Sequence, residues 1–578
     1  MPLLKMQRQG KKASAERSLK SQILVFLQIK TFYIVFFMEY KFLSRLARPA
    51  FALALCLFSL ASCSDEEPFT DDNIVVPPPA DSIPEGDVLI ADENLRAALL
   101  TLLKTDELTP ENLATVHNLS LRAKNYSTLE GISALVNLDS LTIDNNTGKA
   151  LIEFPSEIVS MKHLTYLDAS GVFRGTLPDS LSGFTYFSVG ESFMEGKIPP
   201  HLMDLSAERI MLHISRSRFS GLPVDTWIKL CADAEEFEMT PSLAPQADGY
   251  FLSLYDPDSA LHTQYHADGD FQIYQPHSKG NGINMYIVCD GFDHSCNAVG
   301  GIAEKVMKFC VEQMFDIEPM TSLREYFDIY LVYAESPEKG MTYSTSGNEN
   351  DWDWYVETKF NTRQPSVSGR YYLCDTPGII DFVGQSTGTS ARSGIVLLIA
   401  HNMIHGGSAG MEYVADRTSF SVSTIEPKFA KTVWHECVGH SIGWLADEYV
   451  SSENALLEIP QETKDYMVWD YNRYDYCRNV AFSNDTAAVW WADFIGDERY
   501  ADEEIGLYEG ANYWGKGVWR PTDNSIMNTY DRDQQFNAPC RAIIYKEVMT
   551  RALGSEFTYS YEDFVKFDMK DAYYPLVP

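Results

Sequence analysis

The residues with the clearest chemical meaning lie in one short segment, residues 434–449, which reads WHECVGHSIGWLADEY. It contains two histidines, His435 and His440, and an acidic residue, Glu436, directly after the first histidine. Imidazole nitrogens are common ligands of Zn²⁺, and a glutamate near a zinc-activated water can accept its proton. The segment therefore predicts a hydrolytic zinc site.

The spacing of the two histidines predicts a distorted helix. They are five residues apart, one more than in the usual His-Glu-x-x-His zinc motif. On a regular α-helix a separation of five residues places two side chains about 140° apart, which is too far to reach one ion. A π-type turn would absorb the extra residue, and Gly439 would lower its cost. We therefore predict a bulge between Glu436 and His440.

A catalytic zinc ion needs a third protein ligand and one open coordination position. No histidine follows His440 in the sequence, so the third ligand has to be a carboxylate. Asp447 is the best candidate, because Gly443 allows the helix to end and the chain to turn back toward the metal. The alternatives, in order of preference, are Glu448 and then Glu453 or Glu458.

The pattern His-Glu-x-x-Gly-His followed by Ala-Asp-Glu-Tyr resembles the M64 family of metallopeptidases, the IgA-peptidase type. The resemblance extends over residues 265–550, where 282–292 and 327–340 resemble the family's first two strands and the loop after the second. It implies bound Zn²⁺, Glu436 as the catalytic base, and an α+β (α/β-like) peptidase fold of the zincin or metzincin type.

A second segment, residues 524–528 (NSIMN), resembles the methionine turn beneath the metal in metzincins. This resemblance implies that Met527 forms an apolar floor and is not a ligand. Tyr530 follows three residues later, and some metzincins carry a tyrosine two residues after that methionine. Tyr530 is therefore the candidate for a catalytic hydroxyl that stabilises the oxyanion.

The elements that must position these residues follow an α/β pattern from residue 281 onward. We expect a peptidase domain over 281–578, with residues 394–400 and the following His405–Gly407 as the edge strand and rim that pair with an extended substrate. The apolar runs predict strands at 283–289, 327–333 and 394–400, and helices at 299–315 and 428–444.

Upstream, the sequence resembles a leucine-rich repeat. Residues 135–146 (LVNLDSLTIDNN) have its apolar spacing, and glycines at 175, 196 and 221 are 21 and 25 residues apart. Stacked repeats cover one another's apolar faces, so we expect an α/β solenoid over 89–230 that binds a protein or glycan ligand. Residues 231–280 form a small β segment or linker.

The N-terminal segment, residues 1–63, differs in composition, with ten basic and two acidic residues. A short apolar run ends in Leu-Ala-Ser-Cys, which resembles the lipobox of bacterial lipoproteins and predicts lipidation at Cys63. Met38 is the expected start of this signal. The acidic, proline-containing residues 64–88 form a tether, and the acidic residues just after Cys63 resemble a surface-export signal of Bacteroidetes lipoproteins. We expect an exported lipoprotein of the outer membrane, at the cell surface or periplasmic face.

The composition of the chain indicates folded domains and excludes one class of partner. The chain has 578 residues, 45% of them hydrophobic, as expected for several folded domains. Its net charge of −35 argues against a nucleic-acid partner, which requires a basic surface. The sequence therefore predicts a multidomain, lipid-anchored zinc endopeptidase that acts on extracellular proteins or peptides. The alternative is a leucine-rich repeat adhesin whose peptidase domain is inactive.

Overall fold

The computed structural model describes residues 88–122, 126–144, 152–232, 252–344, 352, 354–365, 371–412, 417–529 and 535–569. The predictions for Cys63, Met38 and Tyr530 lie outside these residues, as does nearly all of the predicted tether. Within the described residues, no helix combines the length and the apolar character needed to cross a bilayer.

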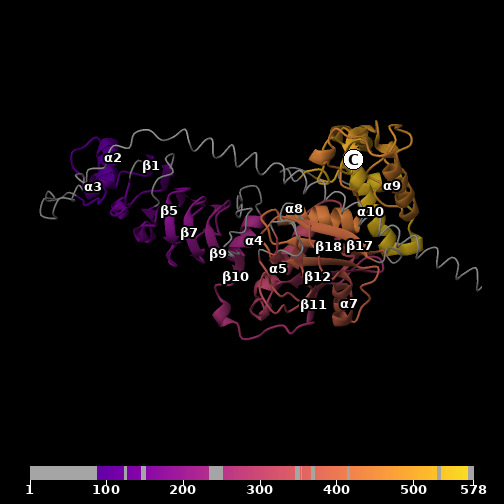
Figure 1. Ribbon diagram of the computed structural model, residues 1–578, viewed down its shortest axis with the longest axis horizontal. Coiled ribbons are helices and arrows are strands. Elements are labelled where there is room, and N and C mark those ends of the chain that lie inside the picture. Colours follow the sequence, from indigo (N-terminus) through magenta and orange to yellow (C-terminus); the bar gives the residue numbers. More distant parts are fainter. Residues whose placement is uncertain are drawn as a thin grey trace, which may run out of the picture. The chain divides into compact units, whose positions relative to one another are not determined.

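The N-terminal region contains two sheets of parallel strands (Figure 1). From β2 to β9, successive strands along the chain belong alternately to one sheet and to the other. Leu141, Leu167, Phe187 and Leu212 occupy equivalent positions on adjacent strands of the first sheet and are fully buried. Each strand is too short to bury its apolar face alone, so the stacking of neighbours stabilises the region. In spatial order, the first sheet contains β1 (Asn118–Arg122), β2 (Ser140–Asp144), β4 (Tyr166–Asp168), β6 (Tyr186–Ser188) and β8 (Met211–His213), and the second contains β10 (Ser253–Tyr255), β9 (Arg218–Pro223), β7 (Phe193–Lys197), β5 (Phe173–Thr176) and β3 (Ile152–Glu153).

Short helices precede and follow these sheets. Helix α2 (Glu93–Leu103) begins at Asp92, whose side chain accepts hydrogen bonds from the backbone N–H groups of Asn94 and Leu95. The other short elements of the N-terminal region are α3 (Pro110–Leu113), η2 (Ile132–Ala134), η3 (Ser156–Ser160), α4 (Val224–Ala232) and η4 (Ser259–Leu261).

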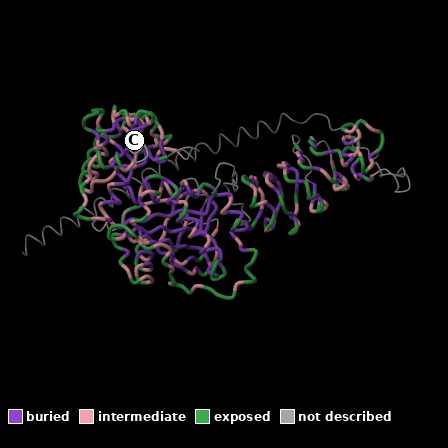
Figure 2. The backbone as a smooth tube through the Cα atoms, turned by 180° about the vertical axis from the view of Figure 1, so that it is seen from behind, coloured by how far each residue is buried: buried purple, intermediate pink, exposed green. Residues whose placement is uncertain are grey.

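The C-terminal region is organised around a six-stranded mixed sheet. Its central strands β12, β13, β16 and β18 run parallel, whereas β11 and β17 run antiparallel at its two edges. Buried residues are dense in this region (Figure 2). The sheet strands, in spatial order, are β11 (Phe271–Gln275), β13 (Phe327–Val332), β12 (Ile283–Asp290), β16 (Ile395–Ala400), β18 (Thr418–Thr424) and β17 (Gly407–Glu412).

Helices cover both faces of this sheet. The central strands contact α5 and η8 on one face and α7 on the other, as expected for parallel strands that are apolar on both sides, and α10 packs against η8. The principal helices are α5 (Ile302–Met314), α7 (Thr376–Thr387), α8 (Phe429–Thr432), η8 (Val433–Ile442), α9 (Gln461–Tyr474), α10 (Ala538–Leu553) and α11 (Tyr561–Asp568). The smaller elements are η5 (His294–Asn297), α6 (Met320–Leu323), η6 (Arg324–Tyr326), β14 (Thr342–Tyr343), β15 (Arg363–Gln364), η9 (Ser452–Asn454), η10 (Ala492–Phe494), η11 (Glu498–Glu503), β19 (Tyr508–Ala511), β20 (Trp514–Arg520) and η12 (Gly554–Glu556).

The prediction that residues 394–400 form the edge strand is wrong. They form β16, which pairs with β12 on one side and β18 on the other. All residues of β16 are buried, because its uninterrupted apolar sequence suits the centre of a sheet. The edge is β17, a strand of small residues (GSAGME) that lacks the hydrophobic pattern by which strands are recognised.

The segment 231–280 does not form a sheet of its own. Strand β10 joins the N-terminal sheet beside β9, whereas β11 joins the C-terminal sheet beside β13. Helix α4 runs across the expected boundary at residue 230, and its Trp227 packs against Phe309 and Phe429, with ring centroids 5.3 and 5.4 Å away. The described parts of the two regions therefore share a core.

Candidate metal centre

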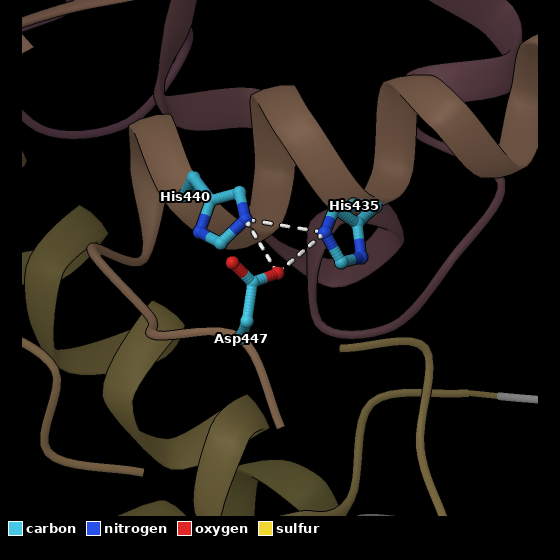
Figure 3. Close-up of side chains that lie close together, drawn as sticks. All are labelled: His435, His440 and Asp447. Atoms are coloured by element: carbon cyan, nitrogen blue, oxygen red, sulfur yellow. Dashed lines mark hydrogen bonds and ion pairs between the residues drawn. The ribbon is translucent and has the colours of Figure 1, made fainter. Parts of the chain in front are cut away.

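The helix that carries His435 and His440 is a π-helix, η8, over ten residues. At its end, the Gly443 N–H donates to the Val438 carbonyl, five residues earlier, at 2.9 Å. This confirms the predicted π-type distortion, although it extends through the whole of Val433–Ile442 and is not a single bulge. As a result, both imidazoles lie on one side, with their Nε2 atoms 3.1 Å apart (Figure 3).

Gly439 has a second role that its sequence context does not reveal. A Cβ at this position would lie 2.4 Å from the sulfur of Met527. Met527 is fully buried and packs directly against the π-helix at Gly439. The glycine is therefore required by packing as well as by backbone distortion.

Asp447 reaches the same centre from the chain after the helix. Its Oδ1 lies 3.1 Å from His435 Nε2 and 3.3 Å from His440 Nε2. The turn that brings it back includes Trp444, which has a φ of +54°, and the buried Asn479 side chain then bonds both the N–H and the carbonyl of Ala446. Among the described residues, His435, His440 and Asp447 are the one set whose candidate ligand atoms all lie within 4.8 Å of one another.

The outward nitrogens of the two rings fix how they face this centre. His435 Nδ1 lies 2.9 Å from the Ile526 carbonyl, and His440 Nδ1 lies 2.7 Å from the Leu445 carbonyl. A carbonyl can only accept, so each Nδ1 carries the proton and each Nε2 directs a lone pair inward. Two lone pairs and a carboxylate oxygen then converge on one point, and a cation is the partner that satisfies all three.

The spacing of the three ligand atoms fits zinc. With zinc–ligand bonds of about 2.0–2.1 Å, neighbouring corners of a tetrahedron lie about 3.3 Å apart. The three observed separations are 3.1, 3.1 and 3.3 Å. The residues present therefore fit a tetrahedral site with two imidazoles, one carboxylate and one open position.

The electrostatics of the cluster also favour positive charge. Burial by itself lowers the pKa of His440, but the negative charge of Asp447 outweighs burial and raises this pKa to about 9. Conversely, burial opposes ionisation of Asp447, yet the two imidazoles hold its pKa far below the usual range. The ionised Asp447 therefore stabilises a positive charge at this centre, even when that charge is only the proton on His440.

Tyr513 is a site residue that the sequence did not reveal. Its hydroxyl donates to Oδ2 of Asp447, the oxygen that faces away from the histidines. Burial and the neighbouring carboxylate raise the pKa of Tyr513 well above its usual range, so the phenol remains a donor. Tyr513 and Asn512 both have positive φ, at 72° and 50°, in the turn between β19 and β20. The Asn512 N–H donates to the Asp447 carbonyl at 3.0 Å, which holds this strained turn against the ligand.

Glu436 lines an open cavity of about 840 Å³ that includes the three candidate metal ligands. Burial raises the pKa of Glu436, as expected for a carboxylate that must accept a proton near neutral pH. A Cβ on Gly407 would lie 2.6 Å from Glu436 Cγ, so edge strand β17 begins directly beside the predicted base. The remaining lining residues are Tyr371, His405, Gly406, Ser408, Ala409, Gly410, Trp444, Leu445, Ala446, Tyr449, Tyr471, Tyr476, Cys477, Asn512, Tyr513 and Asn528.

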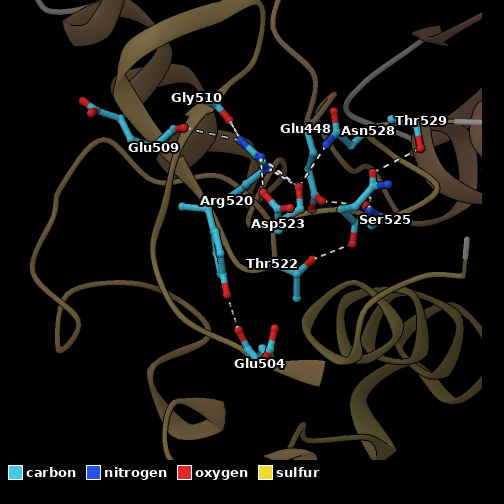
Figure 4. A network of polar contacts seen from close by, with 12 residues as sticks. Glu448, Glu504, Glu509, Gly510, Arg520, Thr522, Asp523, Ser525, Asn528 and Thr529 are labelled. Carbon is cyan, nitrogen blue, oxygen red and sulfur yellow. Dashed lines mark hydrogen bonds and ion pairs between the residues drawn. The ribbon is translucent and has the colours of Figure 1, made fainter. Parts of the chain in front are cut away.

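Glu448, the second candidate ligand, faces away from this cavity and is fully buried. It accepts a hydrogen bond from Ser525 Oγ at 2.6 Å (Figure 4). It also accepts one from Asn479 Nδ2 at 3.0 Å. Its backbone N–H donates to the Met527 carbonyl at 2.8 Å. Glu448 therefore holds the turn at 525–527, whose Ile526 carbonyl orients His435. Glu453 and Glu458 are exposed and do not belong to the cluster.

Comparison with known proteins agrees with this site. The model of the IgA peptidase M64 family matches residues 271–500 and 492–548. No curated protein matches the chain.

Three of the solved structures that match cover between 16% and 29% of the chain. A structure of CBM51-2 and INT domains from Clostridium perfringens ZmpB is 19% identical, with a TM-score of 0.13, over 16% of this chain and 19% of its own. An internalin from Listeria monocytogenes is 15% identical, with a TM-score of 0.20, over 28% of this chain and 55% of its own. Internalin C2 from the same organism is 16% identical, with a TM-score of 0.15, over 29% of this chain and 95% of its own.

The first two of these matches thus span less than two thirds of the matched chains, and these TM-scores carry no argument about this fold. The family match, in contrast, contains the π-helix, Asp447 and the turn at Met527 in one continuous region. Residues 271–548, which contain the candidate metal centre, therefore match the M64 peptidase family.

Proposed function

We propose that this protein is a zinc-dependent endopeptidase of the zincin type that hydrolyses extracellular proteins or peptides. The observation that carries the proposal is the convergence of two imidazole nitrogens and the Asp447 carboxylate at 3.1–3.3 Å beside Glu436, in an open cavity. These residues would hold Zn²⁺ and leave one position for a water or substrate oxygen.

Bound Zn²⁺ supplies Lewis acidity toward water and the scissile carbonyl. Glu436 accepts the proton of the attacking water and passes it to the leaving amine, so its raised pKa suits both steps. Asp447 and Tyr513 keep the ligand set oriented. Tyr530 remains a proposed donor to the oxyanion.

The substrate would lie along β17. Within the described residues this strand pairs with β18 alone, so its outer edge can accept an extended peptide by β-augmentation. Gly407, Ser408, Ala409 and Gly410 line the cavity, and their small side chains leave the backbone accessible beside Glu436.

Replacement of the base tests the enzymatic proposal. Glu436→Gln keeps the shape of the side chain but removes proton transfer, so we expect stoichiometric zinc and a loss of about 10²–10⁴-fold in cleavage of a protein panel. Metal analysis and product mass spectrometry measure both quantities. If zinc-loaded wild type and variant are equally inactive, the peptidase proposal fails and an adhesin with an inactive domain becomes the better account.

We further propose that the chain is a lipoprotein attached to the outer membrane through Cys63. The support is the Leu-Ala-Ser-Cys sequence that ends the basic N-terminal segment. Cys63→Ser should abolish incorporation of labelled palmitate and release the protein from the membrane fraction. Equal labelling of the variant would contradict the anchor, and protease treatment of whole cells distinguishes surface from periplasmic exposure.

The N-terminal sheets have the alternating strand arrangement of stacked repeats, and we propose that they are leucine-rich repeats that bind a protein or glycan.

A further inference from the structure

The cavity beside the metal centre is lined by two chemically different sets of residues. The set along β17 is small, and it consists of Gly406, Gly407, Ser408, Ala409 and Gly410. The second set comes from segments that follow the π-helix in the chain and is rich in tyrosine. We refer to its four tyrosines as the tyrosine cluster: Tyr449, Tyr471, Tyr476 and Tyr513.

The rings of the tyrosine cluster form two contacting pairs. The ring centroids of Tyr471 and Tyr476 are 5.2 Å apart, and those of Tyr449 and Tyr513 are also 5.2 Å apart. The side chain of Asn512, next to Tyr513, joins the two pairs, because its Nδ2 donates to the Tyr471 hydroxyl at 2.9 Å. The four rings therefore belong to one connected group beside the metal centre.

Three hydroxyl groups of the tyrosine cluster already bond inside the protein. The Tyr513 hydroxyl donates to Asp447, and the Tyr476 hydroxyl donates to Asp470. The Tyr471 hydroxyl accepts the hydrogen bond just described. Burial raises the pKa of all three phenols well above the usual range, so they are neutral. What these side chains mainly offer to a ligand is therefore ring surface, which binds apolar groups.

The charges that line the cavity lie at the metal centre and at its rim. Among the described residues, no lysine or arginine lines it, and the acidic and histidine residues that do so are His405, His435, Glu436, His440 and Asp447. A charged substrate side chain that entered the tyrosine cluster would lose hydration without gaining an oppositely charged partner among the tyrosines. The cluster therefore favours an uncharged, apolar side chain.

Packing behind the tyrosine cluster holds its rings in place. Tyr471 packs against a separate apolar core. Tyr476 contacts Trp444, with ring centroids 6.2 Å apart, and the Arg417 guanidinium lies 4.4 Å from the centroid of the Trp444 ring. Rings that are ordered before a substrate arrives lower the entropic cost of binding. The residues of the apolar core are Ala446, Ile459, Val480, Ala511 and Val518.

A peptide that lies along β17 can place a side chain in this part of the cavity. Side chains of an extended peptide point alternately to the two faces of a sheet. Gly407 lies on the face that contacts η8, since a Cβ there would lie 2.6 Å from Glu436 Cγ. Every second substrate side chain would therefore point to the face on which the metal-binding helix lies, and so into the cavity that the tyrosine cluster lines.

We propose that the tyrosine cluster is a specificity subsite that accepts a large apolar side chain, preferably an aromatic one, at one substrate position beside the scissile bond. Tyr476, whose ring contacts both Tyr471 and Trp444, is its central residue. This inference rests on the proposed peptidase function and names the class of substrate that the same site selects.

A peptide series tests the preference. Zinc-loaded full-length protein receives peptides in which each position around the scissile bond is in turn phenylalanine, leucine, aspartate or lysine, and kcat/KM is measured for each. At one position we expect kcat/KM to be about 10–100-fold higher for phenylalanine than for aspartate or lysine, as for the burial of one apolar side chain. Equal kcat/KM for all four residues at every position would overturn the proposal.

Tyr476→Ala tests whether the tyrosine cluster causes this preference. We expect the ratio of kcat/KM for phenylalanine over aspartate to fall about three- to tenfold, because a favourable ring contact is lost. Tyr476→Phe keeps the ring and should keep the ratio. Tyr466→Ala is the matched control, since Tyr466 lies on the surface of α9, is 60% exposed and does not line the cavity. An unchanged ratio in Tyr476→Ala would overturn the role of the cluster.

A second variant covers a folding defect. If Tyr476→Ala binds no zinc, Tyr476→Leu replaces it, and the preference for phenylalanine over leucine should then fall. A peptide with an O-linked sugar that is cleaved faster than its unmodified form by the wild type, but not by the Tyr476 variant, would show that the tyrosine cluster binds a sugar and would overturn the apolar subsite.

The outcomes separate this subsite from the proposed function. Cleavage by the wild type without any preference for apolar residues removes the subsite and leaves the peptidase intact. If zinc-loaded wild type and Glu436→Gln are equally inactive on every peptide, the proposed function itself fails.

Discussion

At the scale of single residues, the orientation of each side chain decides whether it can bind a metal. His435 and His440 are held by carbonyls at Nδ1, so both present Nε2 to the centre. Asp447 presents one oxygen to this centre and gives the other to Tyr513. A carboxylate constrained in this way binds through one oxygen, which preserves an open coordination position.

Tyr513→Phe should weaken zinc binding about 10–100-fold, because it removes the hydrogen bond that orients Asp447. Competition with a chelator of known affinity measures this change. Tyr476→Phe is the matched control, since Tyr476 also lines the cavity but donates to Asp470. Equal zinc affinity of Tyr513→Phe and the wild type would show that the strained turn at Asn512 and Tyr513 has another purpose.

At the scale of elements, the π-helix η8 depends on the turn beneath it. The side chain of Met527 packs against Gly439, which has no side chain to block it. The hydrogen bond from Ser525 to Glu448 holds the turn that carries Met527 in place. The helix and the turn are 80 to 90 residues apart in the sequence, yet neither could position His435 alone. The unusual histidine spacing is therefore stabilised by tertiary packing as well as by the local sequence.

Gly439→Ala should destabilise the domain by about 1–3 kcal/mol, because the added methyl group overpacks a fully buried contact. Thermal or denaturant unfolding measures the change. Met527→Ala should also destabilise, by about 2–5 kcal/mol, through loss of buried volume. The double variant should be less destabilised than the sum of the two, because each change makes room for the other. Strict additivity would contradict direct packing of these residues.

At the scale of the whole molecule, the described N-terminal sheets and the peptidase sheet share residues at their junction. Trp227 of α4 is fully buried among peptidase residues, and the Leu254 N–H of β10 donates at 3.2 Å to Nε2 of the buried His401, which follows β16. A deletion that ends at residue 230 would remove most of α4. Deletion variants that test the role of the repeats in substrate choice should therefore retain this helix.

Trp227→Ala should destabilise the full chain by about 3–5 kcal/mol, because it empties a large buried volume and leaves the Ile425 carbonyl without its donor. Differential scanning calorimetry of the intact protein measures this loss. Trp469→Ala is the control, since Trp469 is 54% exposed and should change stability by about 0.5 kcal/mol or less. Similar transition temperatures for both variants would argue against a shared core.

The sequence by itself determined the ligand types, the π-type distortion and the order of the main strands. These depend on local chemistry: a His-Glu-x-x-Gly-His spacing has few helical solutions, and long apolar runs form buried strands. The sequence ranked Asp447 ahead of Glu448, but only the tertiary structure shows that Asp447 lies in the cluster and Glu448 outside it, since two adjacent carboxylates differ in which way the chain turns. It also shows that Tyr513 donates to Asp447 and that Trp227 is buried against Phe309 and Phe429. The edge of the sheet is β17 and not β16, as the sequence had predicted. The contacts of Tyr513 and Trp227 join residues 66 or more apart, and the sheet edge depends on pairing partners, so no local pattern encodes them.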